Sequence, residues 1–179
     1  MSEGEHRVEY ETRSNGTIAV VSMTRERYRN PLSQQMMQEL EVAFDRAAED
    51  DDVRMFILRG EGPTFTTGHD LGSPDVTETR AERGRQNMAG NCDRTRGMDI
   101  DPHLKWRNIP KPTIAIVQGD CIYAAWMLAS AMDVVFAADD AQFLPTNSQY
   151  FAVLWEIGAR RAKYLMFDNR FLSADEALD

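Results

Sequence analysis

The chain has 179 residues, 42% of them hydrophobic and 27% charged, which is typical of a globular protein, so we expect a single domain over residues 1–179. Its net charge of −9 argues against a nucleic-acid partner, because such binding needs a basic surface. No apolar run is long enough to cross a membrane and the N-terminus is unlike a signal peptide, so we expect no membrane partner and a cytoplasmic location.

The N-terminal part has the pattern of a β-hairpin followed by an amphipathic helix. Asn15-Gly16 is the signal of a type I′ turn, and the β-rich runs on both sides predict a hairpin over residues 8–24. Ser33 can cap a helix over residues 34–49. Apolar residues recur along that helix at the spacing of one buried face: Met36, Leu40, Phe44 and Ala47.

Short apolar runs predict three further strands, at residues 53–59, 113–117 and 133–138. Residues 122–132 are apolar on every side, which predicts a buried helix after a turn at residues 118–120. A strand that leads into such a helix directs the first N–H groups of the helix toward a point just beyond the strand end. This geometry suits an anion or a developing oxyanion, although an ordinary crossover has the same pattern.

A Gly- and Thr-rich loop, GEGPTFTTGHDL, follows the strand at 53–59. Gly68 beside His69 allows a sharp turn with exposed backbone N–H groups, and two such turns after parallel strands would bring two donors to one site. Residues 72–101 are polar and charged, so we expect a mobile segment with one helix near 78–88, either a lid or surface disorder.

The C-terminal half adds three predicted helices. One begins or continues at residues 103–108 and ends before Pro110, and a second begins near Gly158. Ser173 and Glu176 have the spacing of a capping box, which predicts the start of a last helix.

In order along the chain, four segments resemble the crotonases, the enoyl-CoA hydratase/isomerase superfamily. RYRNPLS at 27–33 is similar to the N-A-L-S stretch before the family's first helix, and TFTTGHDL at 64–71 is similar to F-S-A-G-x-D-L. Residues 111–143 resemble the K-P-x-I-A-x-V-x-G core with its following helix, and residues 161–179 resemble the helix pair that precedes G-L-V. The resemblance covers roughly residues 8–179. It implies an α/β fold, the crotonase-like spiral of ββα units, with parallel pairing of strands 53–59 and 113–117.

The resemblance also implies an acyl-CoA thioester substrate, with no further cofactor and no metal. In this family two backbone N–H groups bind the thioester carbonyl oxygen and stabilise the enolate, and these donors correspond to His69 and Ala124. The other positions expected to contact the CoA thioester are Arg29, Pro31, Leu32, Gly68, Asp70 and Leu71. Arg25, Arg27 and Arg29 would either face the CoA phosphates or be solvated surface charges.

Three side chains near the expected donors allow alternative interpretations. Tyr123 replaces a family glycine and would either project into the pocket or pack against the core. The imidazole of His69 is a candidate acid or base, although the residue at this position can serve through its backbone alone. Asp70 is better explained as a turn residue that accepts backbone N–H bonds than as a catalytic base.

Both acids of a hydratase are missing. Hydration needs two carboxylates that handle one water, and the family glutamates correspond here to Met127 and Asn147. Methionine carries no proton and asparagine is no general base. Glu156 would supply a carboxylate if the segment after Phe143 folds toward the pocket, and would otherwise be a surface residue.

The resemblance leaves three functional hypotheses. In the first, the chain is an acyl-CoA enzyme of this lyase and isomerase family that uses the oxyanion hole for isomerisation, thioester hydrolysis or C–C cleavage, and the resemblance implies a role in fatty acid metabolism. In the second, it is a strict hydratase with displaced acids. In the third, it is an inactive acyl-CoA binder or assembly subunit. We favour the first. The family's C-terminal helical part has no counterpart here, so we expect self-association as a trimer or hexamer through apolar surface that those helices would cover.

Overall fold

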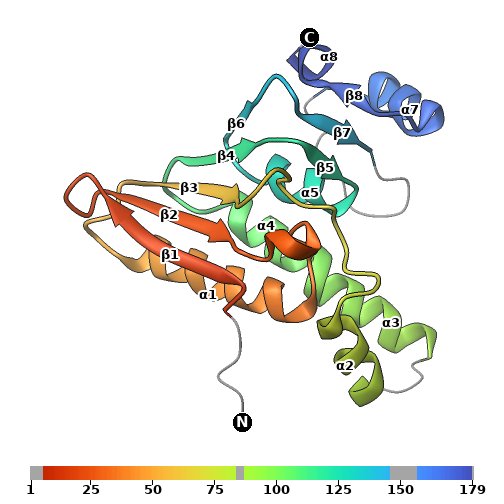
Figure 1. Ribbon diagram of the computed structural model, residues 1–179, viewed down its shortest axis with the longest axis horizontal. Helices are drawn as coiled ribbons and strands as arrows, with labels where there is room; N and C mark the ends of the chain where they lie inside the picture. Colours follow the sequence, from red (N-terminus) through yellow and green to blue (C-terminus); the bar gives the residue numbers. More distant parts are fainter. Residues whose placement is uncertain (1–5, 84–86, 146–156, 179) are drawn as a thin grey trace.

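The computed structural model describes residues 6–83, 87–145 and 157–178 in two sheets (Figure 1). The first sheet has five strands in the order β1-β2-β3-β4-β6. These are β1 (Val8–Arg13), β2 (Ile18–Met23), β3 (Met55–Gly60), β4 (Thr113–Val117) and β6 (Val134–Ala137). A smaller sheet consists of β5 (Asp120–Ile122), β7 (Gln142–Leu144) and β8 (Leu172–Ser173).

The strand pairing confirms the predicted α/β architecture. β1 and β2 form an antiparallel hairpin, with Val8 opposite Met23. β3 lies parallel to β4, with Phe56 opposite Thr113, as the crotonase-like spiral requires. β2 with β3 and β4 with β6 are parallel as well, so the strands that lead toward the site all end at the same edge of the sheet.

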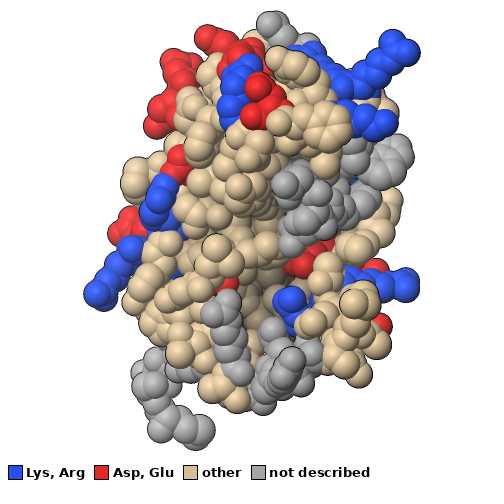
Figure 2. Space-filling model, turned by 90° about the vertical axis from the view of Figure 1, so that its right-hand side faces the viewer, with Lys and Arg blue, Asp and Glu red and all other residues tan. Residues whose placement is uncertain are grey.

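The helices are α1 (Gln34–Glu49), α2 (Pro74–Arg83), α3 (Met88–Thr95), α4 (Asp101–Arg107), α5 (Ala124–Ser130), α7 (Ala159–Asp168) and α8 (Ala174–Leu178). A 3₁₀ turn, η1 (Glu26–Tyr28), precedes α1, and a π-helical turn, η2 (Arg96–Ile100), joins α3 to α4. The side of the molecule at the right of Figure 1 carries basic side chains near its top, where α7 lies, and is hollowed lower down (Figure 2). Within the described ranges, no helix has the length and apolarity needed to cross a membrane.

The core includes the buried faces of the first sheet, α1, α4 and α5. Ser33 caps α1 as predicted, because its hydroxyl accepts a hydrogen bond from the Met36 N–H at 3.1 Å. The predicted apolar face of α1 is fully buried. Its Phe44 ring lies 5.0 Å from Phe56 of β3 and 4.7 Å, edge to face, from Trp106 of α4. The amphipathic pattern of residues 34–49 therefore specified both the helix and the surface on which it packs.

The hairpin turn lies where the sequence predicted it. Arg13 pairs with Ile18, so Asn15 and Gly16 are at the centre of the loop; both have a positive φ, and the Thr17 N–H donates to the Ser14 carbonyl at 3.4 Å. Two other local predictions were wrong. The helix expected over 122–132 begins at Ala124, because residues 120–122, expected to end the turn and begin the helix, pair with β7 as a strand. The segment 72–101 is far more helical than one short helix: α2, α3 and η2 occupy most of it.

A buried ionic cluster explains why α2 forms in so polar a segment. The Asp75 carboxylate at the start of α2 accepts hydrogen bonds from Arg25 at 2.7 Å, from Arg7 at 2.6 Å and from the Ser33 hydroxyl at 2.9 Å. Burial by itself would raise the pKa of Asp75, but the bonds from Arg7 and Ser33 and the charges of Arg25 and Arg7 outweigh it and lower the pKa below 3.8. The ionised carboxylate therefore stabilises the fold above pH 3.8, and this stabilisation is lost as the pH falls through the lowered pKa.

Replacing Asp75 by asparagine should lower the free energy of unfolding at pH 7 by about 3 kcal/mol, because Arg25 would remain buried without its nearest carboxylate. Urea denaturation measures the change. Glu11, which pairs with Arg13 on the surface, gives the control: Glu11→Gln should cost less than about 1 kcal/mol. The difference in unfolding free energy between Asp75→Asn and the unmodified chain should become smaller below pH 3.8. Equal unfolding free energies at pH 7 would contradict the stabilising role of the cluster.

Candidate active site

The loop after β3 is held on both sides by backbone hydrogen bonds. On one side, the Leu32 N–H donates to the Gly68 carbonyl at 2.8 Å and the Asp70 N–H donates to the Leu32 carbonyl at 3.2 Å. On the other side, the Ile122 N–H donates to the Thr66 carbonyl at 3.3 Å, and Thr66 forms a parallel bridge with Cys121 of β5. Residues 66–70 thus lie as a strand-like link between the start of α1 and β5.

Gly68 lies directly against the start of α5. Its φ is +77°, and a Cβ at this position would lie 2.3 Å from the Ile122 carbonyl oxygen and 3.2 Å from the Ala124 nitrogen. Only a residue without a side chain permits such an approach together with this backbone conformation. Because His69 is the next residue, the backbone at residues 68–69 lies against the first residue of α5.

The entry into α5 is strained at Tyr123, with φ +52° and ψ −108°. A bulky residue rarely adopts a positive φ, and such conformations often mark functional sites. The Tyr123 N–H donates to the Leu144 carbonyl at 2.9 Å, which holds the bend against β7. Among the described residues, nothing accepts a hydrogen bond from the Ala124 N–H, as expected for the first residue of a helix.

Asp70 stabilises the loop, as the sequence predicted. One carboxylate oxygen accepts bonds from the Gly72 N–H at 3.1 Å and from the Ser73 N–H at 2.8 Å, and the other accepts from the Ser73 hydroxyl. The buried guanidinium of Arg25 lies 3.7 Å away. With these contacts the Asp70 carboxylate is committed to the backbone of the turn.

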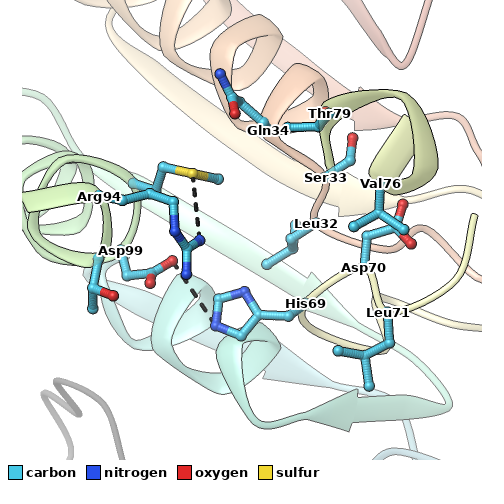
Figure 3. A pocket seen from close by; sticks show the side chains of 12 residues that line it. Leu32, Ser33, Gln34, His69, Asp70, Leu71, Val76, Thr79, Arg94 and Asp99 are labelled. Atoms are coloured by element: carbon cyan, nitrogen blue, oxygen red, sulfur yellow. Dashed lines mark hydrogen bonds and ion pairs between the residues drawn. The ribbon is translucent and has the colours of Figure 1, made fainter. Parts of the chain in front are cut away.

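Beside the loop lies a cavity of about 260 Å³. Residues 32–34 and 69–71 form one wall, Val76 and Thr79 of α2 form another, and residues 94–99 close it (Figure 3). Its acidic residues are Asp70 and Asp99, and its basic residues are His69 and Arg94. A small, partly apolar cavity with a few polar groups is the arrangement of a small-molecule site.

Asp99 lies on η2 and is 5% exposed. Figure 3 shows its carboxylate and the His69 ring directed toward each other, with 3.9 Å between Asp99 Oδ1 and His69 Nε2. Burial raises the pKa of the Asp99 carboxyl above its ordinary value, and the charges of His69 and Arg94 act in the opposite direction. The sequence offered little to single out this residue, which was one of many acids in a polar segment.

The other expected site residues are distributed as follows. Leu32 and Leu71 line the cavity, and Gly68 lies in the loop against α5. Pro31 is buried immediately before Leu32. Tyr123 is 41% exposed, so it neither packs against the core nor lines the cavity. Met127 is buried in the core on α5. Asn147 and Glu156 lie outside the described residues.

The three arginines expected near CoA differ in their surroundings. Arg25 is buried in the ionic cluster with Asp75, so it is neither a phosphate ligand nor a solvated surface charge. Arg29 is exposed and pairs with Asp120, while Arg27 is exposed beside the Tyr28 ring. In the part of the chain that the structure describes, no group of three or more His, Cys, Asp or Glu side chains could hold a metal ion.

Comparison with known proteins identifies relatives of this chain. Residues 13–179 match the family model described as enoyl-CoA hydratase/isomerase. EchA13 of Mycobacterium tuberculosis is 34% identical over 190 residues, covering 95% of this chain and 60% of that protein, and the enoyl-CoA hydratase EchA19 of the same organism is 34% identical over 171 residues, covering 90% and 62%. The chain therefore spans about three fifths of the length of these relatives.

A solved structure gives the same result for the fold. The crystal structure of a probable enoyl-CoA hydratase from Mycobacterium smegmatis superposes with a TM-score of 0.85 at 32% identity, over 96% of this chain and 68% of that one.

Replacing Gly68 by alanine should displace the loop from α5, because the added Cβ would meet the Ile122 carbonyl. Gly16 is a matched control: its φ is +89°, but a Cβ there would have nothing within 4 Å. We predict that Gly16→Ala costs about 1 kcal/mol of unfolding free energy from φ alone and that Gly68→Ala costs about 3 kcal/mol. Urea denaturation of both variants measures the difference, and equal losses would show that the close approach is unimportant.

Proposed function

The chain belongs to the enoyl-CoA hydratase/isomerase family, and we propose that it binds an acyl-CoA thioester and stabilises its enolate through the backbone N–H groups of His69 and Ala124. The observation that carries the proposal is the contact between Gly68 and the start of α5. This contact brings the peptide after Gly68 next to the Ala124 nitrogen. Two preorganised donors at one point are what a developing oxyanion needs.

The surroundings support a thioester substrate. Leu32, Leu71, Val76 and Met98 supply apolar surface beside the loop, which suits an acyl chain. Because both donors are backbone groups, the change from glycine to alanine at position 124 keeps the N–H and adds only a methyl group. The proposed oxyanion hole, which consists of these two N–H groups, therefore does not depend on the side chains that differ from the family pattern.

We also propose that the chain self-associates, as a trimer or hexamer, and acts on fatty acyl-CoA in the cytoplasm. The support for self-association is the exposed apolar surface of β6, where Phe136 is 60% exposed and Val134 and Val135 are also exposed. A second copy of the chain would cover this surface. An assembly subunit that only binds acyl-CoA is the alternative supported by the buried Met127.

A pair of ligands tests the two donors: butyryl-CoA, and S-butyl-CoA, which lacks the carbonyl oxygen. We predict that the unmodified chain binds butyryl-CoA roughly tenfold more tightly, since each hydrogen bond contributes about 0.5–1.5 kcal/mol. Ala124→Pro removes one N–H at a position where a helix tolerates proline, and should lose most of this preference while it keeps its affinity for S-butyl-CoA.

Ala125→Pro is the matched control, because it changes the next residue of the same helical turn and should keep the preference. Calorimetry gives the four affinities, and thermal unfolding checks that both variants are folded. An unmodified chain that binds the two ligands equally, or binds neither, would contradict the proposed function.

Hydration of crotonyl-CoA should be reduced to a trace, because Met127 and Asn147 occupy the positions of the two acids. General acid–base catalysis contributes about 10²–10⁴-fold per group, and no side chain at these positions can supply it. The absorbance of the conjugated thioester follows the reaction. A turnover of about 1–10³ s⁻¹ would overturn this expectation, and a hydratase activity gained by Met127→Glu with Asn147→Glu would show that the rest of the site is in place.

A further inference from the structure

We propose that Asp99 is the catalytic base of this site and removes a proton from the α-carbon of the bound acyl thioester. The inference rests on the proposed function, because the proton becomes acidic only when the carbonyl oxygen is held by the two N–H donors. It assigns the proton transfer to η2, an element that carries neither of the positions where the family glutamates are expected. The observations that support it are the position, the partners and the availability of the Asp99 carboxylate.

The backbone around Asp99 is fixed in an unusual conformation. η2 is a π-helical turn between two α-helices, a feature that is rare and often occurs at functional sites. The buried His103 Nδ1 lies 2.5 Å from the Asp99 carbonyl oxygen, and since a carbonyl only accepts, Nδ1 carries the hydrogen. Burial lowers the pKa of His103 to about 4, so this histidine is neutral at physiological pH and anchors the turn without adding charge.

Among the described residues that line the cavity, two carry carboxylates, Asp70 and Asp99, and they differ in their availability. Asp70 is occupied by the backbone of its own turn, by Ser73 and by the nearby Arg25. Within the described ranges, by contrast, no residue donates a hydrogen bond to the Asp99 carboxylate, although it is 5% exposed and lines the cavity. A buried carboxylate that the fold does not use is expensive to retain and is a candidate for function.

Within the part of the chain that the structure describes, three groups face Asp99, and each affects its charge differently. His69 lies 3.9 Å away on the loop that also provides a backbone donor, so substrate bound there would lie close to both side chains. Arg94 reaches from α3, where its Nη1 lies 4.0 Å from Met98 Sδ (Figure 3). His103 of α4 is neutral. Burial raises the pKa of Asp99 and makes it a stronger base than an exposed aspartate, while His69 and Arg94 keep the ionised form accessible.

The proposed step is balanced without any other reagent. The α-carbon C–H bond breaks, its proton moves to a carboxylate oxygen of Asp99, and its electron pair moves into the thioester to give an enolate oxygen held by the two N–H groups. Return of a proton from Asp99 to the same carbon restores the substrate, and return to another carbon gives an isomer. In D₂O the returned proton is a deuteron, because the partly exposed His69 beside Asp99 provides a route to solvent.

Deuterium exchange at the α-carbon of butyryl-CoA, followed by mass spectrometry, tests the step. We expect exchange by the unmodified chain and at least a 10²-fold slower exchange by Asp99→Asn, which is nearly isosteric but no base. The control is Asp101→Asn: Asp101 lies two residues on, is exposed and pairs with Arg96, so its removal should leave exchange unchanged. Asp99→Asn should keep the preference for butyryl-CoA over S-butyl-CoA, because both backbone donors remain.

The pH profile of the exchange gives a second readout, which a purely structural role would not produce. Exchange by the unmodified chain should fall at low pH as Asp99 is protonated, with a midpoint above the ordinary 3.8 of aspartate. His69→Gln keeps the backbone N–H but removes a positive neighbour, so this midpoint should move to higher pH. Binding without exchange by the unmodified chain, or undiminished exchange by a folded Asp99→Asn variant, would overturn the assignment of Asp99 alone. Absence of the carbonyl preference would instead overturn the proposed function.

Discussion

The site depends on one steric constraint, the absence of a side chain at residue 68. Residues 66–70 are bonded to Leu32 on one side and to β5 on the other, so the loop has little freedom to move away from α5. The Ile122 carbonyl and the Ala124 nitrogen occupy the space where a Cβ would be. Any larger residue would separate the loop from the helix. It would also separate the two N–H groups that we propose bind the thioester oxygen.

A second constraint is ionic and shapes the cavity. Arg25 is buried between Asp75 at the start of α2 and Asp70 in the loop, so a single guanidinium joins two walls of the cavity. Arg7 and Ser33 complete the hydrogen bonding of Asp75. The charges on this side are therefore neutralised within the fold. On the opposite side, Asp99, His69 and Arg94 lie together at the cavity, where their charges can act on a ligand.

The sequence predicted the fold better than it predicted the site. Patterns of apolar residues located the hairpin, α1 and the parallel strands, because these elements each bury a regular face in one core. The sequence did not predict the helices of residues 72–101, because this segment has little apolar periodicity of its own. Its helices depend on long-range contacts such as those of Asp75 with Arg7 and Arg25. The sequence also assigned Arg25 a surface or ligand role, since nothing local shows that an arginine will be buried against two carboxylates. Asp99 was missed for the same reason, because nothing local shows that it will be buried beside His69, which is distant in the sequence.

The separation of oxyanion stabilisation from proton transfer explains how such a site can change its chemistry. Backbone donors depend on the course of the chain, so substitutions at positions 123, 124 and 127 leave them in place as long as Gly68 and the bend at Tyr123 persist. Proton transfer depends on one side chain near the α-carbon, and any element that borders the cavity can supply it. In this chain, α5 buries a methionine where an acid is expected, whereas η2 places a buried carboxylate in the cavity. One base is sufficient to form and quench an enolate, but activation of water for hydration requires a second acid–base group. If the chain acts as we propose, chemistry at the α-carbon is therefore favoured over the addition of water.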